Sequence, residues 1–188
     1  DIMNQVGYDY ATFGNHEFDY GMDVALSLLD KSDAKYLSCN FTKEDNLVTD
    51  AYAIETYGDL KVAYVGICTP ETFTKSTPTY FQDEDGNYIY GFCEGNGGKD
   101  LYQAVQNAID AAKAAGADYV IGLGHLGIDE QSSPWTSKEV IANTTGFDAF
   151  IDGHSHSTIP GEAVKNKENK DVILTSTGTK LANIGKMT

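Results

Sequence analysis

Short runs rich in β-branched and aromatic residues alternate along this chain with helical patterns, and this alternation constrains the fold more than any other feature. Three of the runs are almost continuously apolar, which is typical of strands buried on both faces of a sheet. Strands that alternate with helices predict an α/β domain with a largely parallel central sheet. The predicted strands are YDYATF (8–13), KYLSCN (35–40), KVAYVGIC (61–68), DYVIGLG (118–124), FDAFIDG (147–153) and DVILTSTG (171–178).

Two segments between these strands predict helices, over residues 21–32 and 98–116. In the second, apolar residues recur every three or four positions, and Gly116 follows as a typical helix stop. These apolar positions are Leu101, Val105, Ala108, Ile109 and Ala112.

Residues 69–98 interrupt the alternation, because they are rich in Thr, Tyr, Gly and acidic residues. A hairpin-like stretch near the middle favours an insertion or loop excursion over a separate domain. Within it, DEDGN (83–87) has the composition of a calcium loop but lacks the remaining ligand spacing, so we predict a tight turn there.

Composition excludes several classes of protein. The 188 residues carry a formal charge of −15, and no basic patch offsets it, which argues against a nucleic-acid partner. An anionic substrate would therefore need a local positive centre, such as a metal ion. The three cysteines include no CxxC pair, which argues against a disulfide scaffold and against a cysteine-rich zinc site.

All four histidines lie at or just beyond the end of a predicted strand. His16 follows the first strand, His125 the fourth, and His154 and His156 the fifth. Ligands of open α/β sheets bind at the carboxyl ends of strands. One histidine at this edge would more often be a core or loop residue, but four together favour a site. Imidazoles suit Zn²⁺, Mn²⁺ or Fe, and Asn15 adds an oxygen donor, so the pattern predicts a mixed nitrogen and oxygen metal site.

The neighbouring positions predict details of this site. His154 and His156 are two residues apart and would point the same way in an extended chain. The acidic residues nearby are expected to be structural rather than ligands. Glu17 would cap a loop, Asp129 and Glu130 would cap a helix, and Asp148 and Asp152 would orient histidines or lie in solvated turns.

Three motifs in register resemble one known family. GNHEFDYG (14–21), GHLG (124–127) and DGHSH (152–156) are similar to the calcineurin-like binuclear metallophosphoesterases, and among these to the 5′-nucleotidase family. The order and spacing of the motifs agree over essentially the whole chain. The resemblance implies an α/β fold that is part of a four-layer αββα sandwich. Residues 1–188 would be a fragment of its catalytic domain, incomplete at the N-terminus.

The resemblance also implies roles for matching residues. Asn15, His125 and His154 would bind one divalent ion, and His156 would bind a second. His16 would stabilise the transition state and act as general acid, oriented by Asp19. The cofactors would be two ions among Zn, Mn, Fe, Co and Mg. The implied reaction is hydrolysis of a phosphate ester, foremost a nucleoside 5′-monophosphate, by metal-activated water.

The sequence departs from the family pattern in two respects. An Asp-x-His pair and a Gly-Asp pair, which supplies the bridging carboxylate, are not found upstream of Asn15, and the nucleotide-binding C-terminal domain is also absent. We therefore expect this chain to bind one ion or none and to be inactive alone. The alternatives are a 2′,3′-cyclic-nucleotide phosphodiesterase, a UDP-sugar hydrolase, a thiosulfate-ester hydrolase, or a non-catalytic surface protein with a vestigial site.

Further expectations concern partners and location. The partner would be a small phosphate ester such as a nucleotide, and not a nucleic acid. Exposed strand edges would favour association into a homo-oligomer. The parent protein would be extracellular, at the cell surface or periplasmic, as is common in the family.

Overall fold

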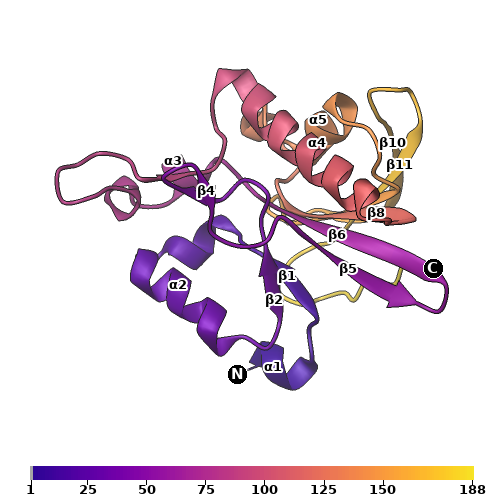
Figure 1. Cartoon of the computed structure of the whole chain (residues 1–188), viewed down its shortest axis with the longest axis horizontal. Helices are drawn as coiled ribbons and strands as arrows, with labels where there is room; N and C mark the ends of the chain where they lie inside the picture. The colour runs from indigo at the N-terminus through magenta and orange to yellow at the C-terminus, as the bar shows by residue number, and fades with distance from the viewer. Residues whose placement is uncertain (1) are drawn as a thin grey trace.

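A mixed six-stranded sheet forms the centre of the protein (Figure 1). The computed structural model describes residues 2–188, so Asp1 of the predicted domain lies outside the described residues. The strand order is β10-β11-β9-β8-β6-β5, in which the four inner strands are parallel and both edge strands antiparallel. The predicted α/β class with a largely parallel core is confirmed. The strands are β5 (Tyr52–Tyr57), β6 (Leu60–Cys68), β8 (Tyr119–His125), β9 (Ala149–Asp152), β10 (Thr158–Lys165) and β11 (Asp171–Thr177).

Two helices cover one face of this sheet. They are α4 (Lys99–Ala114) and α5 (Ser137–Asn143). Thr136 caps α5 by accepting a hydrogen bond from the Glu139 amide, and the Glu139 carboxylate accepts one from the Thr136 amide in return. All five apolar positions predicted for α4 are buried against the sheet: Leu101, Val105, Ala108, Ile109 and Ala112.

A second, two-stranded parallel sheet packs against the opposite face, near β6 and β8. It consists of β1 (Tyr10–Thr12) and β2 (Lys35–Leu37), and the Tyr10 ring stacks on Tyr64 of β6 with centroids 5.1 Å apart. Helix α2 (Met22–Lys31) lies beyond this small sheet, and α1 (Ile2–Val6) precedes it (Figure 1). The layers therefore follow the order helix, sheet, sheet, helix, as the αββα expectation requires.

Residues 69–98 help to build a second core made of aromatic rings. The segment contains α3 (Thr72–Lys75), the 3₁₀ turns η2 (Pro78–Phe81) and η3 (Asn96–Gly98), and β7 (Tyr90–Gly91). Strand β7 pairs with β3 (Thr42–Lys43), which in turn pairs with β4 (Asn46–Leu47). The buried rings of this cluster are Phe13, Phe18, Phe41, Phe81, Tyr90 and Phe92.

The tight turn predicted at DEDGN is confirmed. The Gly86 amide donates to the Asp83 carbonyl at 3.1 Å, and the Asp83 carboxylate accepts from the amides of Asp85 and Asn87 at 3.0 and 2.8 Å. The Asp83 side chain is thus engaged in holding the turn.

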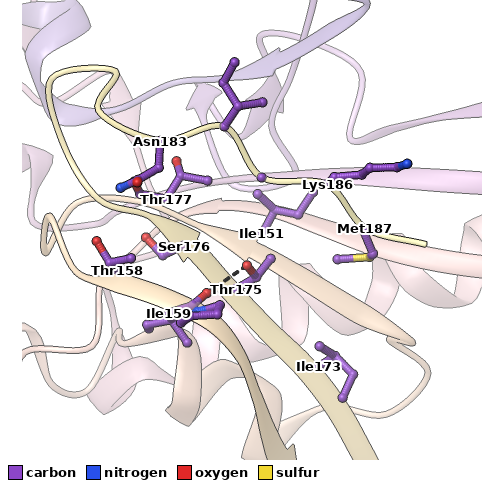
Figure 2. A pocket seen from close by; sticks show the side chains of 13 residues that line it. Ile151, Thr158, Ile159, Ile173, Thr175, Ser176, Thr177, Asn183, Lys186 and Met187 are labelled. Carbon is purple, nitrogen blue, oxygen red and sulfur yellow. Dashed lines mark hydrogen bonds between the residues drawn. The ribbon is translucent and has the colours of Figure 1, made fainter.

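An apolar pocket lies over the outer strands β10 and β11, and no histidine lines it (Figure 2). Ile151, Ile159 and Ile173 line it from the sheet, and the C-terminal segment passes above them with Ile184 and Met187. The pocket holds no histidine or acidic side chain, so it is part of the packing of the C-terminal segment rather than of the predicted site.

Residues 2–188 contain neither a candidate membrane-spanning helix nor a disulfide. None of their helices is both long and apolar enough to span a bilayer. None of their cysteines is in a disulfide, since Cys39, Cys68 and Cys93 are all free thiols.

Candidate metal centre

The site is built at the carboxyl ends of the central strands. Cys68 at the end of β6 pairs with His125 at the end of β8, so both strands finish at the same edge. Strand β9 ends at Asp152, and the loop after it carries His154 and His156. The residues that follow β1 form the 3₁₀ turn η1 (Asn15–Phe18).

Residues three apart lie on the same side of a 3₁₀ turn, and this rule sorts the side chains of η1. Asn15 and Phe18 both point inward and are 4% and 0% exposed. His16 and Asp19 point outward together, and the His16 Nδ1 atom lies 2.8 Å from the Asp19 Oδ2 atom. The His16 ring is 75% exposed, so it faces solvent at the rim of the site.

Three of the predicted ligands converge. The Oδ1 atom of Asn15 lies 3.2 Å from the Nε2 atom of His125, and the rings of His125 and His154 have centroids 5.0 Å apart. Metal–nitrogen and metal–oxygen bonds of about 2.1 Å place neighbouring ligands about 3.0–3.4 Å apart. The distance of 3.2 Å between the Asn15 oxygen and the His125 nitrogen lies within this range. The spacing of the Asn15–His125 pair is therefore compatible with two ligands of one divalent ion.

Close packing at Gly14 brings η1 to His125. A β-carbon at Gly14 would lie 2.9 Å from Nε2 and Cε1 of His125, and 2.9 Å from the Glu17 carboxylate. The Glu17 carboxylate also accepts a hydrogen bond from the Gly14 amide, which confirms that Glu17 caps this loop. Only glycine leaves room for the imidazole at this distance from Asn15.

The extended-chain prediction for His154 and His156 is wrong. Both residues have left-handed backbones, with φ of 79° and 55°. Because β9 already ends at Asp152, the chain turns tightly, and the Ser155 amide donates to the Gly153 carbonyl at 3.1 Å. His154 is folded inward, with 14% of its side chain exposed, whereas His156 is exposed. Within residues 2–188, His156 forms no hydrogen bond to the other predicted ligands.

The environment keeps the His125 imidazole neutral. Burial lowers the pKa of His125 to about 4, and the nearby His154, His16 and His156 contribute in the same direction. A neutral imidazole has a nitrogen lone pair free for a metal, so this electrostatic setting favours a ligand role.

Two aspartates tie strand β9 to β8, and the solvated-turn interpretation is wrong for Asp152, which is buried, whereas Asp148 is exposed in a bend before β9. The Asp148 carboxylate accepts a hydrogen bond from the Val120 amide at 2.8 Å. Asp152 Oδ1 accepts from the amides of Leu126 and Gly127 at 3.0 and 3.3 Å, which fixes the GHLG loop beside His125. Burial raises the pKa of Asp152, whose Oδ2 atom is buried without a hydrogen-bond partner among the described residues.

The two acids after GHLG lie at a short 3₁₀ turn, η4 (Glu130–Ser132). Asp129 is its N-cap residue and Glu130 its first residue, but the Asp129 side chain forms no capping hydrogen bond. The expectation that these acids cap a helix is therefore confirmed only in part. Asp129 occupies the N-cap position, but its side chain does not cap the turn.

One residue of the site was missed by the sequence analysis. The side chain of Glu71 is 7% exposed, and its Oε2 atom lies 2.7 Å from Nε2 of His154. A usable signal existed, because Glu71 comes three residues after the predicted strand 61–68 and so lies at the same edge as the histidines. Among residues 2–188, no three His, Cys, Asp or Glu side chains are arranged to hold a metal, and the convergence depends on the Asn15 amide.

Comparison with known proteins identifies the family. The family model described as bacterial capsule synthesis protein PGA_cap matches residues 1–183. The chain belongs to this family. Its relatives also confirm the resemblance to the 5′-nucleotidase family of calcineurin-like metallophosphoesterases. The chain is 28% identical over 173 residues to the trifunctional nucleotide phosphoesterase protein YfkN of Bacillus subtilis, and 32% identical over 174 residues to a 5′-nucleotidase of Diplobatis ommata.

Solved structures of this metallophosphoesterase group have the same fold. The calcineurin-like phosphoesterase YfkN matches with a TM-score of 0.71 and 25% identity, over 94% of this chain and 56% of that one. A 5′-nucleotidase precursor from Thermus thermophilus matches with a TM-score of 0.70 and 25% identity, over 93% of this chain and 34% of that one. Related calcineurin-like phosphoesterases are metal-dependent.

The sequence matches cover most of this chain but a small part of each relative. They span 85% of the chain and 11% of the Bacillus protein, and 88% of the chain and 26% of the Diplobatis protein. The relatives are nucleotide phosphoesterases and 5′-nucleotidases, which places the chain in a family of phosphoester hydrolases.

Proposed function

We propose that this chain carries part of the active site of a metal-dependent phosphoesterase, for which nucleoside 5′-monophosphates are the foremost substrate class. The observation that supports the proposal most is the convergence of Asn15, His125 and His154. These residues come from three segments far apart in the sequence, and the Asn15 oxygen lies 3.2 Å from the His125 nitrogen. The nucleotidase names of the relatives support the choice of substrate.

In this proposal Asn15, His125 and His154 hold one divalent ion, and the exposed His156 faces the second position. A bound divalent ion lowers the pKa of a coordinated water and stabilises charge on phosphoryl oxygens. It would also offset the charge of −15, which otherwise repels a phosphate ester. The identity of the ion is left to experiment among Zn, Mn, Fe, Co and Mg.

His16 is proposed to donate a proton at the rim of the site. In its imidazolium form it would stabilise the phosphoryl group and protonate the leaving oxygen. Asp19 accepts from Nδ1 of His16 at 2.8 Å, so the opposite nitrogen, Nε2, is left to face a substrate. The exposure of this ring suits a group that must reach a bound ester.

A hydrolysis assay with different phosphate esters would distinguish the other substrate classes. Cyclic 2′,3′-nucleotides, UDP-sugars and thiosulfate esters would use the same donor set, because leaving-group specificity resides elsewhere. A vestigial, non-catalytic site is disfavoured, since the predicted ligands Asn15, His125 and His154 are all present and close together.

Partners and location are also proposals. We propose an exported or surface-attached parent protein, in keeping with a Thermus relative described as a precursor. Association through the sheet edges at β5 and β10 is proposed as well, and gel filtration with light scattering would test it.

Metal content after loading tests the proposed function. We expect about one Mn²⁺ or Zn²⁺ ion per 188-residue chain by mass spectrometry, because the donors fit a single site. His154→Ala should lose the ion, and the control His156→Ala, which alters an exposed histidine, should keep it. No ion in the unmutated chain would contradict the proposal, and two ions would contradict the single site. With no bridging carboxylate motif in the sequence, AMP hydrolysis should stay at background.

A further inference from the structure

Glu71 is a buried carboxylate that none of the roles above uses. It precedes helix α3 and follows β6 by three residues, at the edge where the ligands gather. Its Oε2 atom accepts two hydrogen bonds, both of 2.7 Å: one from Nε2 of His154 and one from the Ser132 hydroxyl.

His154 is the most buried titratable side chain that contacts Glu71. Taking a carboxylate out of water is costly unless it is paired and hydrogen-bonded. The Nζ atom of Lys75 is 3.8 Å from the other oxygen, Oε1, and the lysine side chain is 45% exposed. His154, with 14% of its side chain exposed, is nearly as buried as Glu71 itself.

We propose that Glu71 is a positioning residue that orients His154 as a metal ligand. A carboxylate can only accept a hydrogen bond, so Nε2 of His154 must carry the hydrogen. The lone pair then resides on Nδ1, which becomes the donor for the ion. A carboxylate that fixes the tautomer and the plane of a ligating histidine is a general feature of metal sites. The inference rests on the proposed function, since it concerns the ion that Asn15, His125 and His154 hold.

A purely structural role for Glu71 makes a different prediction. The carboxylate also links the residue before α3 to the 3₁₀ turn η4 through Ser132. If this link were the only role of Glu71, removing the Ser132 hydroxyl would change metal binding as much as removing the charge of Glu71. Ser132→Ala is therefore the matched control, because it breaks the link and leaves the hydrogen bond between Glu71 and His154.

Two measurements on the 188-residue chain test the proposal. Nitrogen-15 NMR of the metal-free protein should show hydrogen on Nε2 of His154 in the unmutated chain and in Ser132→Ala. Glu71→Gln should show a mixture of both tautomers, because the glutamine amide can donate as well as accept. Calorimetric titration with Mn²⁺ should give binding about 10–100-fold weaker in Glu71→Gln and unchanged in Ser132→Ala.

The outcomes separate this inference from the proposed function. Hydrogen on Nδ1 in the unmutated chain would overturn it, and so would an unchanged tautomer and affinity in Glu71→Gln. Equal losses in Glu71→Gln and Ser132→Ala would assign Glu71 a structural role only. If the unmutated chain bound no Mn²⁺, the proposed function would fail, but the NMR of the metal-free protein would still decide whether Glu71 orients His154.

Discussion

The Gly66→Ala variant is expected to be strongly destabilised. Gly66 lies in β6 where the small sheet crosses the large one, and a β-carbon there would stand 2.0 Å from the carbonyl oxygen of Leu37. Because that oxygen belongs to the backbone, no rotation of a side chain relieves the clash. The Cys39 amide donates to the Gly66 carbonyl at 2.8 Å, and separating the segments would break this bond too.

This substitution should destabilise the protein by about 3 kcal/mol or more, because overpacking without room to relax is costly. It should also separate Asn15 from His125, since this contact joins the two sheets that carry them. Urea unfolding followed by circular dichroism measures the effect. Gly161→Ala is the control, because a β-carbon there meets only Ile173, at 3.8 Å. A Gly66→Ala protein as stable as the control would refute the close approach of the sheets.

The metal-free protein should lose stability as the pH falls from about 6.5 towards 4. Burial and the neighbouring histidines lower the pKa of His125 from 6.5 to about 4 in the folded state. Between these values the unfolded chain binds the proton and the folded one does not, so the free energy of unfolding rises with pH. Above the pKa of His125 in the unfolded chain, no stability is lost. Below its pKa in the folded chain, the loss in the free energy of unfolding is complete and reaches on the order of 3 kcal/mol.

Urea unfolding in the presence of a chelator, at pH of about 5 to 7, measures this slope. His125→Gln is the matched control, because it keeps a polar side chain of similar size and cannot titrate. We expect a shallower pH dependence in the variant across this range. Identical slopes in the two proteins would mean that His125 is not buried in its neutral form.

Sequence patterns predicted the parallel core, and they missed the edges of the sheet for a physical reason. Strands β6 and β8 are apolar on both faces and stand out from their surroundings. Strand β10 contains Pro160 and Gly161, which weaken a strand pattern and are tolerated at an edge. Strand β5 is mostly exposed beyond its first residues, so its composition differs little from that of a loop.

The site was predictable in its residue types and less so in its geometry. Placing His125, His154 and Asn15 at strand ends was enough to predict that they meet. The left-handed backbone at His154 was not predicted, because non-glycine residues adopt it only rarely, although histidine does so more often than most. For Glu71 the sequence offers only its place three residues after the strand 61–68, with no motif around it, and the contact with His154 is seen only in the folded chain.

Anomalous X-ray scattering from crystals of this chain soaked in Mn²⁺ tests the metal centre most directly. The proposal predicts one peak within bonding distance of Asn15 Oδ1, a ring nitrogen of His125 and Nδ1 of His154. Diffraction from the His154→Ala variant should show no peak at this place. The proposed metal centre would be contradicted if the manganese ion were bound by other residues while these three side chains kept their metal-free positions.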